Sequence, residues 1–484
     1  MNKQKEINIR QNILKILKDE AETSGHTFLE YDGLYKNLLN VFPVESTDFQ
    51  KAINVLEDQG KIKLKDNNKV YLYSYYNAEK TVAFGVKNLL AQEDKNYTGN
   101  LDDLIASEEK SRSIELVPEQ REAIKSAFKN QISVIIGGSA TGKTETINII
   151  SKLYKEMNPK GKIHLAAATN KAAYKLGKNI GMRATTIHEL LEYDSLSDSF
   201  NYNSYQPLPG QGLLIIDDFN SCDLLLAAGI FNAIGLNYKV VLAGDINHLP
   251  NIKAGMVLRD LTFSKLVPTV ELTETFPEKK ARNILEIANK INDGQIPDFK
   301  NIEGINFIEI NKDYEALNSI INILQNELKD EDLLNYQVIT PVNYGIVGVD
   351  KLNYKIRNIL NPGSNKKKEL GNFRVYDKVI ANINDVDKDI YNGAIGVITK
   401  VRKHDLSVKF RHLTKEVIFR REELDLLQLA YATTAHRSQG SKYSKVIMVL
   451  TKKHRRMLKR NLLYTGVTRA RDELHLVVHP EAIK

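Results

Sequence analysis

Residues 137–144 read Gly-Gly-Ser-Ala-Thr-Gly-Lys-Thr, and this segment constrains the fold more than any other part of the sequence. An apolar run at 134–136 comes directly before it, and a helical stretch follows it. A glycine-rich loop between a buried strand and a helix surrounds phosphate oxygens with backbone N–H groups, and the positive end of the helix faces the same anion. The segment therefore predicts a nucleotide-binding loop in an α/β domain.

The positions of this loop have distinct expected roles. Gly137, Gly138 and Gly142 allow the backbone to bend around the phosphates. The ammonium of Lys143 would reach the β- and γ-phosphates, and the hydroxyl of Thr144 would ligate Mg²⁺. ATP and Mg²⁺ are therefore the expected cofactors. The loop residues expected around ATP are Gly137, Gly138, Ser139, Ala140, Thr141, Gly142, Lys143 and Thr144.

Two carboxylates follow the apolar run at 213–216. Asp217 and Asp218 stand where such a strand ends, and folds of this kind use strand-end carboxylates to hold Mg²⁺ and to position a water molecule. We expect Asp217 to hold the metal through water and Asp218 to be the catalytic base. Together with the phosphate loop, this pair predicts nucleotide hydrolysis.

Short apolar runs alternate with helical stretches along most of the chain. They occur at 133–136, 163–168, 213–216 and 240–243, and a second set follows at 338–340, 446–450 and 474–478. Unbroken apolar runs between helices are typical of buried parallel strands, so we expect two parallel sheets. The stretch 371–425 contains alternating segments such as 406–410 and predicts a small β-barrel inserted into the second set.

The region before the phosphate loop has a different pattern. Apolar residues have helical spacing at 8–20, near 31–40 and at 47–58, and residues 61–73 alternate in the manner of a β-hairpin. Helices followed by a hairpin predict a small winged-helix-like domain, which a further helix at 77–91 closes. The polar stretch 92–113 is predicted to be a linker.

Charge and composition limit the class of protein. The chain of 484 residues has a formal net charge of +8, which fits a polyanionic partner. Its one cysteine, Cys222, excludes an intrachain disulfide framework and a cysteine-rich zinc site. No apolar run has membrane-spanning length, and the charged N-terminus is unlike a secretory signal. We therefore expect a cytoplasmic protein.

An ordered series of short motifs extends over nearly the whole chain. Gln120 comes first, and further motifs lie at 168–176, 185–191, 242–250, 272–276, 432–450 and 464–471. The series resembles the superfamily 1 helicases of the RecD and Dda group, which move 5′ to 3′ on single-stranded DNA. Residues 341–353 and 373–397 also resemble the second half of RecD-type enzymes. The resemblance implies two RecA-like motor domains, the second carrying an SH3-like barrel.

The family implies roles for the matching positions. Gln120 would contact adenine, Asp245 would couple the nucleotide state to DNA, and Arg469 would be an arginine finger that reaches the γ-phosphate. Gln439 and Gly440 would lie at the cleft between the motor domains. The expected catalytic residues are Lys143, Asp217, Asp218, His248 and Arg469. Polar side chains suit contacts with DNA phosphates and sugars; those expected to contact DNA are Thr169, Asn170, Thr186, His188, Thr434, His436 and Ser438. An ordinary polar surface residue is the alternative for any one of them.

Residues 192–210 stand where RecD-like proteins carry a β-hairpin pin that splits the duplex. Phe200, Tyr202 and Tyr205 are expected to stack against the terminal base pair, since aromatic rings stack on any base. A polar surface loop is the alternative for this segment.

Three positions depart from the family pattern. Asp218 replaces a glutamate, His248 replaces a glutamine, and Pro277 replaces an arginine, although Arg282 lies nearby and could substitute. Because all three positions are expected near the γ-phosphate, they put the rate of hydrolysis in doubt more than ATP binding.

The expected organisation is an N-terminal domain (1–91), a linker (92–113) and motor domains at 114–270 and 271–484. The expected activity is ATP-dependent 5′-to-3′ movement on single-stranded DNA with separation of duplex, by a monomer that binds single-stranded DNA and its junctions with duplex. The N-terminal domain would pack on the motor or contact protein partners. Two alternatives stay open: a nucleotide-binding clamp on DNA or a partner with weak hydrolysis, and an RNA helicase of the same superfamily.

Overall fold

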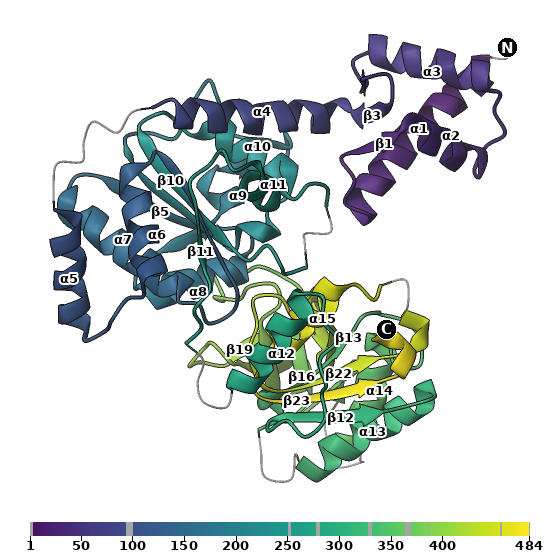
Figure 1. Cartoon of the computed structure of the whole chain (residues 1–484). Coiled ribbons are helices and arrows are strands. Elements are labelled where there is room, and N and C mark those ends of the chain that lie inside the picture. Colours follow the sequence, from purple (N-terminus) through teal and green to yellow (C-terminus); the bar gives the residue numbers. More distant parts are fainter. Residues whose placement is uncertain are drawn as a thin grey trace. The chain divides into compact units, whose positions relative to one another are not determined.

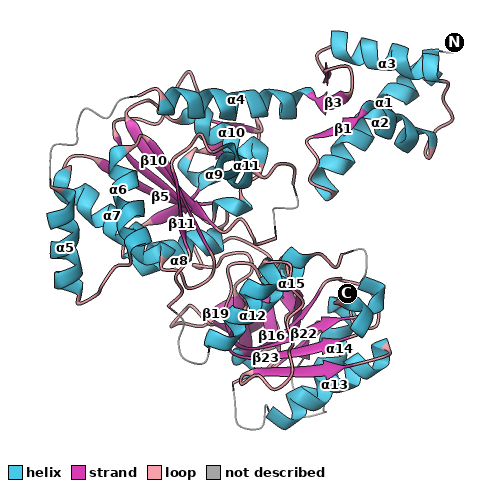
Figure 2. Ribbon diagram, in the orientation of Figure 1, coloured by secondary structure: helices cyan, strands magenta, loops and turns pink. Residues whose placement is uncertain are grey.

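The computed structural model of the chain describes residues 3–92, 100–249, 253–276, 281–327, 332–363, 369–385, 387–454 and 457–483 (Figures 1 and 2). The chain divides into two units, Met1–Ile246 with Pro250–Glu274 and Asn247–Leu249 with Thr275–Lys484. Within the described ranges, no helix is both long and apolar enough to span a membrane. The proposed boundaries at 91, 113 and 270 stay predictions.

The N-terminal region contains three helices and a small antiparallel sheet. The elements are α1 (Lys3–Thr23), β1 (Phe28–Glu30), α2 (Tyr31–Leu39), α3 (Ser46–Asp58), β2 (Ile62–Lys65) and β3 (Lys69–Leu72). Asp66 and Asn67 have φ of 53° and 52°, as a tight turn between paired strands requires. The predicted hairpin is therefore confirmed. The sheet order is β1-β3-β2, and the assignment to the winged-helix class stays a prediction.

Two helices connect this region to the first parallel sheet. Helix α4 (Tyr73–Leu90) packs along α10 (Leu224–Ala233), and a Cβ at Gly85 would lie only 2.8 Å from Phe231 Cβ (Figure 1). Part of the predicted linker is helix α5 (Leu101–Arg112), with Leu101 and Ile105 buried in the core. The sequence did not predict this helix, because its composition is mostly polar. A narrow stripe of apolar residues is enough to pack the helix on the core.

The first unit is built on six parallel strands in the order β11-β4-β10-β9-β5-β6. They are β4 (Ile132–Gly137), β5 (Lys162–Ala167), β6 (Ala184–Thr186), β9 (Gly212–Asp217), β10 (Tyr238–Gly244) and β11 (Thr269–Leu272). Alternate residues of a strand enter separate cores: Leu214 and Ile216 lie in one core and Leu213 and Ile215 in the other. The predicted buried parallel sheet is confirmed.

Helices cover both faces of this sheet (Figure 2). They are α6 (Pro118–Lys129), α7 (Lys143–Met157), α8 (Asn170–Ile180), α9 (Ile187–Leu190), α10 and α11 (Val257–Ser264). The chain leaves β4 for β5 on one side, whereas β10 connects to β11 on the other side of β4. Ligands of open α/β sheets bind beyond the carboxyl ends of the strands at such a switch point. The phosphate loop follows β4 and therefore lies there.

The second unit contains five parallel strands in the order β12-β23-β22-β13-β21. They are β12 (Ile305–Glu309), β13 (Tyr336–Thr340), β21 (Ala432–Thr434), β22 (Tyr443–Leu450) and β23 (Ala470–Val478). The accompanying helices are α12 (Arg282–Asn292), α13 (Asp313–Glu327), α14 (Val349–Leu360) and α15 (Arg460–Val467). The second predicted parallel sheet is confirmed.

An antiparallel sheet is inserted between α14 and β21, as predicted. Its strands are β16 (Lys378–Ala381), β17 (Ile395–Val401), β18 (Asp405–Phe410), β19 (Val417–Arg420) and β20 (Leu427–Leu429), preceded by the short hairpin β14 (Glu369–Leu370) and β15 (Phe373–Arg374). The fully buried Lys378 donates hydrogen bonds to Tyr336 O and Leu333 O, which fastens this sheet to the parallel one. Burial lowers the pKa of Lys378 to about 7.

Candidate active site

The phosphate loop has the geometry that its sequence predicts, between the end of β4 and the start of α7. Ala140 and Gly142 have φ of 62° and 83°, and Thr141 Oγ1 donates to Gly138 O at 3.1 Å. A Cβ at Gly137 would lie 2.6 Å from Thr141 Oγ1 and 2.9 Å from Leu272 O. A side chain at Gly137 would therefore require the loop or β11 to move.

The side chain of Lys143 folds back onto this loop. Its Nζ donates hydrogen bonds to Gly137 O at 2.5 Å and to Gly138 O at 2.6 Å. Burial lowers the pKa of Lys143, whereas the carboxylates of Asp245, Asp217 and Asp218 act in the opposite direction. The ammonium is therefore held over the loop by backbone carbonyls, with three carboxylates close enough to influence its charge.

The three carboxylates extend from neighbouring parallel strands. Asp217 ends β9, and burial raises its pKa while Lys143 lowers it. Asp218 N–H donates to Asp217 Oδ1 at 2.9 Å, and Ser221 Oγ donates to Asp218 Oδ2 at 3.0 Å. Asp245 follows β10, is buried, and donates its N–H to Asn220 Oδ1 at 3.0 Å. Sequence reasoning missed the supporting residues Asn220 and Ser221.

The backbone explains one departure from the family pattern. Asp218 has a φ of 53°, in the left-handed region. Aspartate tolerates this conformation better than longer side chains do, because its short carboxylate hydrogen-bonds locally. The shorter acid at 218 therefore suits the turn that follows β9.

Gln120 is buried and joins α6 to the phosphate loop. Its Oε1 accepts from Val117 N at 3.2 Å, and its Nε2 donates to Thr141 O at 3.3 Å. Both ends of the amide therefore have protein partners in this structure. A contact with adenine stays a prediction.

Arg469, the predicted finger, is 2% exposed within the second unit. Its guanidinium donates to Thr465 O at 2.9 Å, Ser441 O at 3.2 Å and Thr468 Oγ1 at 3.1 Å. It also donates to His248 Nε2 at 2.7 Å. Two residues expected near the γ-phosphate are therefore hydrogen-bonded to each other, and this Nε2 acts as an acceptor without a proton.

Residues of the second unit also hydrogen-bond to the backbone next to His248. Gln439 Nε2 donates to Leu249 O at 2.7 Å, and Leu249 N–H donates to Thr465 Oγ1 at 2.9 Å. Gly440, beside Gln439, has a φ of 65°. The contact between Gln439 and Leu249 gives this glutamine a structural role that its motif did not predict.

Several residues expected to contact DNA have local structural roles. Thr169, Thr186 and Thr434 each accept a backbone N–H three residues onward. Ser438 is fully buried and donates to Ala435 O at 2.7 Å. Its hydroxyl has no exposed surface in this structure, and the contact of Ser438 with DNA stays a prediction.

The remaining predicted DNA contacts differ in exposure. His188 is exposed, and Asn170 is partly exposed at the start of α8. His436 is half-buried, and burial lowers its pKa. These three residues keep surface that a ligand can reach, and their contact with DNA stays a prediction.

The predicted pin contains a real hairpin, formed by β7 (Tyr193–Asp194) and β8 (Ser199–Phe200). Its tip is tied by Asp194, which accepts from Leu196 N at 2.9 Å and from Ser197 Oγ at 2.7 Å. Leu196 is 96% exposed at this tip. The hairpin therefore exposes the apolar side chain of Leu196 on a turn that hydrogen bonds hold in place.

The aromatic residues of this segment behave differently from one another. Phe200 packs against His188 and Tyr193, and a Cβ at Gly229 would lie 2.7 Å from its ring. Tyr202 packs against the core, whereas Tyr205 is 98% exposed. Stacking on DNA by Phe200 and Tyr202 is therefore not supported, because their rings are engaged in packing. Leu196 was missed because a leucine between two serines gives no aromatic signal.

Two positions complete the comparison with the family pattern. Pro277 lies outside the described residues. Arg282 is exposed at the start of α12, and its substitution for the missing arginine stays a prediction.

Comparison with known proteins gives matches to three family models. They are an AAA domain (120–254), a UvrD-like helicase C-terminal domain (429–477) and the SH3 domain of ATP-dependent RecD-like DNA helicases (352–410). The ATP-dependent RecD2 DNA helicase of Deinococcus radiodurans is 30% identical over an alignment of 462 residues that covers 93% of this chain. This chain is similar to RecD-like DNA helicases.

The chain spans 62% of the length of the Deinococcus relative. The RecD subunit of the RecBCD enzyme of Buchnera aphidicola is 24% identical over 559 residues, which cover 94% of this chain and 90% of the subunit. A structure of Pif1 helicases at forked duplex DNA is 19% identical, with a TM-score of 0.47, over 75% of this chain and 92% of that one. The match to the SH3 domain overlaps the inserted antiparallel sheet of this chain.

Proposed function

We propose that this RecD-like chain is an ATP-driven motor that moves 5′ to 3′ along single-stranded DNA and separates duplex. The observation that supports the proposal best is the phosphate loop, where Lys143 Nζ donates to Gly137 O and Gly138 O. Asp217, Asp218 and Asp245 act on the charge of the same ammonium. This arrangement suits a γ-phosphate, a metal ion and an attacking water.

The residues present fit Mg²⁺ and a triphosphate. The hydroxyl of Thr144 and the carboxylate of Asp217 are oxygen donors, which Mg²⁺ prefers. When bound, Mg²⁺ would neutralise charge on the β- and γ-phosphates. Lys143 would exchange its two backbone carbonyls for phosphate oxygens. Asp218, oriented by Ser221 Oγ, would accept the proton of the attacking water.

Arg469 would complete this chemistry as the arginine finger. In the structure it donates to His248 Nε2, so the proposed role requires it to exchange that acceptor for a phosphate oxygen. His248 would then be available to orient water or phosphate with the same nitrogen, as a neutral imidazole can. Nucleotide binding would in this way change the partners of both residues.

Single-stranded DNA and its junctions with duplex are the proposed ligands, and a monomer in the cytoplasm is the proposed state. The proposed DNA contacts use the exposed surface of His188 and Asn170 and that of His436. The N-terminal region is proposed to pack on the motor or to bind a protein partner. Competition between DNA and RNA oligonucleotides of one sequence distinguishes this ligand from RNA.

A nucleotide-dependent clamp with weak hydrolysis is the second candidate. The aspartate at 218 favours this candidate. Its side chain is one methylene shorter than glutamate, so its carboxylate would lie farther from the attacking water and hydrolysis would be slower. Steady-state ATP turnover with and without single-stranded DNA separates the two functions. A motor gives strong stimulation by DNA, whereas a clamp binds DNA in the presence of ATP without a comparable rise in turnover.

We expect Leu196→Ser to slow duplex unwinding about tenfold, because an apolar side chain wedged between base pairs helps to offset the cost of unstacking them, which is about a few kcal/mol per step. ATP turnover stimulated by single-stranded DNA stays at the wild-type rate, since the loop and its carboxylates are unchanged. Strand-displacement and ATPase assays on the same preparation measure the two quantities. The matched control is Leu236→Ser, which replaces a leucine that is 48% exposed elsewhere in the same unit. Wild-type unwinding by the Leu196 variant would show that this hairpin is not the separating element.

A further inference from the structure

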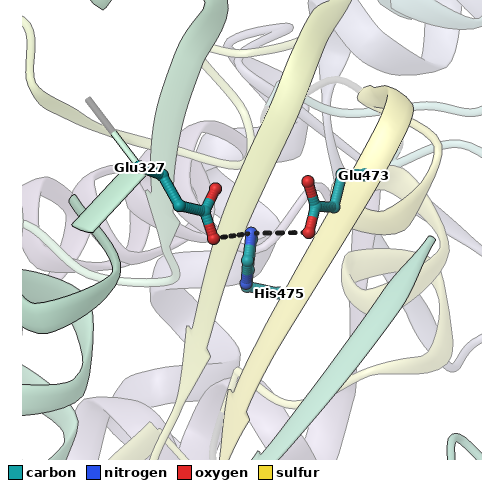
Figure 3. A group of neighbouring side chains, drawn as sticks. All are labelled: Glu327, Glu473 and His475. Carbon is teal, nitrogen blue, oxygen red and sulfur yellow. Dashed lines mark ion pairs between the residues drawn. The ribbon is translucent and has the colours of Figure 1, made fainter. Parts of the chain in front are cut away.

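A group of metal-ligating side chains lies in the second unit, apart from the nucleotide site (Figure 3). Glu473 and His475 stand two residues apart on β23, so their side chains leave the same face of the strand. Glu327 of α13 faces the same point. One helix and one strand therefore bring together two carboxylates and an imidazole.

The distances in this cluster are long for hydrogen bonds. His475 Nε2 lies 3.4 Å from Glu327 Oε1 and 3.5 Å from Glu473 Oε1. An N–H···O bond has a donor–acceptor distance of about 2.7–3.2 Å. His475 is 2% exposed, and its Nε2 has no hydrogen-bond partner among the described residues. The buried nitrogen is thus aimed between two carboxylates and lies at ion-pair distance from both (Figure 3).

The same distances suit a metal ion between the three atoms. Zinc binds histidine nitrogen and carboxylate oxygen at about 2.0–2.2 Å, and two ligands of a tetrahedral ion then lie about 3.3–3.6 Å apart. The three candidate ligand atoms all lie within 4.8 Å of one another. Only small side-chain adjustments are needed to close them on one ion.

Lys445 orients the two carboxylates without occupying the gap. Its Nζ lies 3.2 Å from Glu327 Oε2 and 3.1 Å from Glu473 Oε2, which leaves the Oε1 atoms directed at His475. Tyr336 OH also donates to Glu327 Oε2 at 3.2 Å, and Asn306 Nδ2 donates to Glu473 Oε1 at 2.6 Å. Partners of this kind hold metal ligands in place.

Charge and access also suit a divalent cation. Two carboxylates beside one ammonium leave a net charge of −1 when the imidazole is neutral, which is the form that binds a metal ion. A pocket of about 770 Å³ lies beside the cluster, lined by residues that include Phe299, Asn306, Phe307, Glu327 and His475. An ion can reach the site from this pocket, and a water can supply a fourth ligand.

We propose that Glu327, Glu473 and His475 bind a zinc-like divalent transition-metal ion. One imidazole, two carboxylates and an open position match the ligand types and number that zinc takes in proteins with a water ligand. The ion joins α13 to β23 and so stabilises this part of the second unit. The site is independent of ATP and of the proposed motor activity.

The test is titration of the metal-free full chain with Zn²⁺, without nucleotide, by calorimetry, and with Co²⁺ by visible absorption. We expect one Zn²⁺ per chain at this site and a Co²⁺ spectrum of low coordination number. His475→Asn and Glu327→Gln each weaken binding at least tenfold, since even a supporting residue is worth about 10–100-fold. His404→Asn, in an exposed turn of the inserted sheet, is the control and binds as the wild type does.

Thermal unfolding distinguishes loss of metal binding from a folding defect in a variant. Zn²⁺ raises the unfolding midpoint of the wild type and of His404→Asn, whereas the midpoint of Glu327→Gln stays unchanged. Glu327 is only partly buried, so this variant retains the fold if His475→Asn does not. Absence of a bound ion in the wild type would overturn the proposal. Equal Zn²⁺ affinity of the wild type and Glu327→Gln would overturn it as well.

Discussion

Lys143→Ala will abolish ATP hydrolysis, with a loss of at least about 10²–10³-fold, the effect of removing one preorganised donor from a transition state. The physical reason is that Lys143 is the ammonium at the mouth of the phosphate loop, where it now donates to Gly137 O and Gly138 O. Binding of single-stranded DNA without nucleotide will persist, because the residues proposed to contact DNA lie elsewhere. Steady-state ATP turnover and fluorescence anisotropy of labelled DNA measure the two effects.

Lys155→Ala is the matched control for this variant. Lys155 lies near the other end of α7 and is exposed, where it donates to Pro159 O. Its removal takes the same charge from the same helix and will leave turnover unchanged. Normal hydrolysis by Lys143→Ala would place the ATP site elsewhere in the chain.

Arg469→Ala will still bind ATP but will lose the stimulation of turnover by single-stranded DNA. Arginine fingers in related chemistry contribute about 10³–10⁵-fold to the rate. The variant also removes the donor that satisfies Thr465 O and Ser441 O in a buried site. Because unpaired buried groups cost about 1–3 kcal/mol each, the second unit will unfold at a lower temperature as well.

Two further variants separate the chemical role of Arg469 from its structural role. Arg469→Lys keeps the positive charge but cannot make the same set of hydrogen bonds, and we expect it to remain defective in stimulated turnover. Arg471→Ala removes an exposed arginine from the same strand and will behave as the wild type does. Full DNA stimulation in Arg469→Ala would contradict the finger assignment.

The parts of the site that are continuous in the sequence could be predicted from it. The phosphate loop and the carboxylates at 217–218 are short segments next to apolar strands, so local pattern determines both their identity and their place in the sheet. The parallel sheets and the inserted antiparallel sheet follow from the same alternation. The hairpin at 193–200 was predicted from its position in the family pattern.

Contacts between distant segments could not be predicted in this way. His248 and Arg469 are 221 positions apart, and no spacing rule joins them. Glu327 is likewise far in the sequence from Glu473 and His475. The burial of Ser438 and the packing of the Phe200 ring could not be predicted either, because a polar or aromatic residue in a functional motif can also serve the fold.

The most direct test of the proposed motor is the unwinding of two duplexes that differ only in the strand end that carries a single-stranded tail. Wild-type chain, ATP and Mg²⁺ are mixed with a 5′-tailed or a 3′-tailed duplex at one stated salt concentration, since binding to DNA depends strongly on salt. We expect strand separation that requires ATP on the 5′-tailed duplex and none on the 3′-tailed duplex. Equal unwinding of both duplexes, or ATP turnover without separation of either, would contradict the proposal.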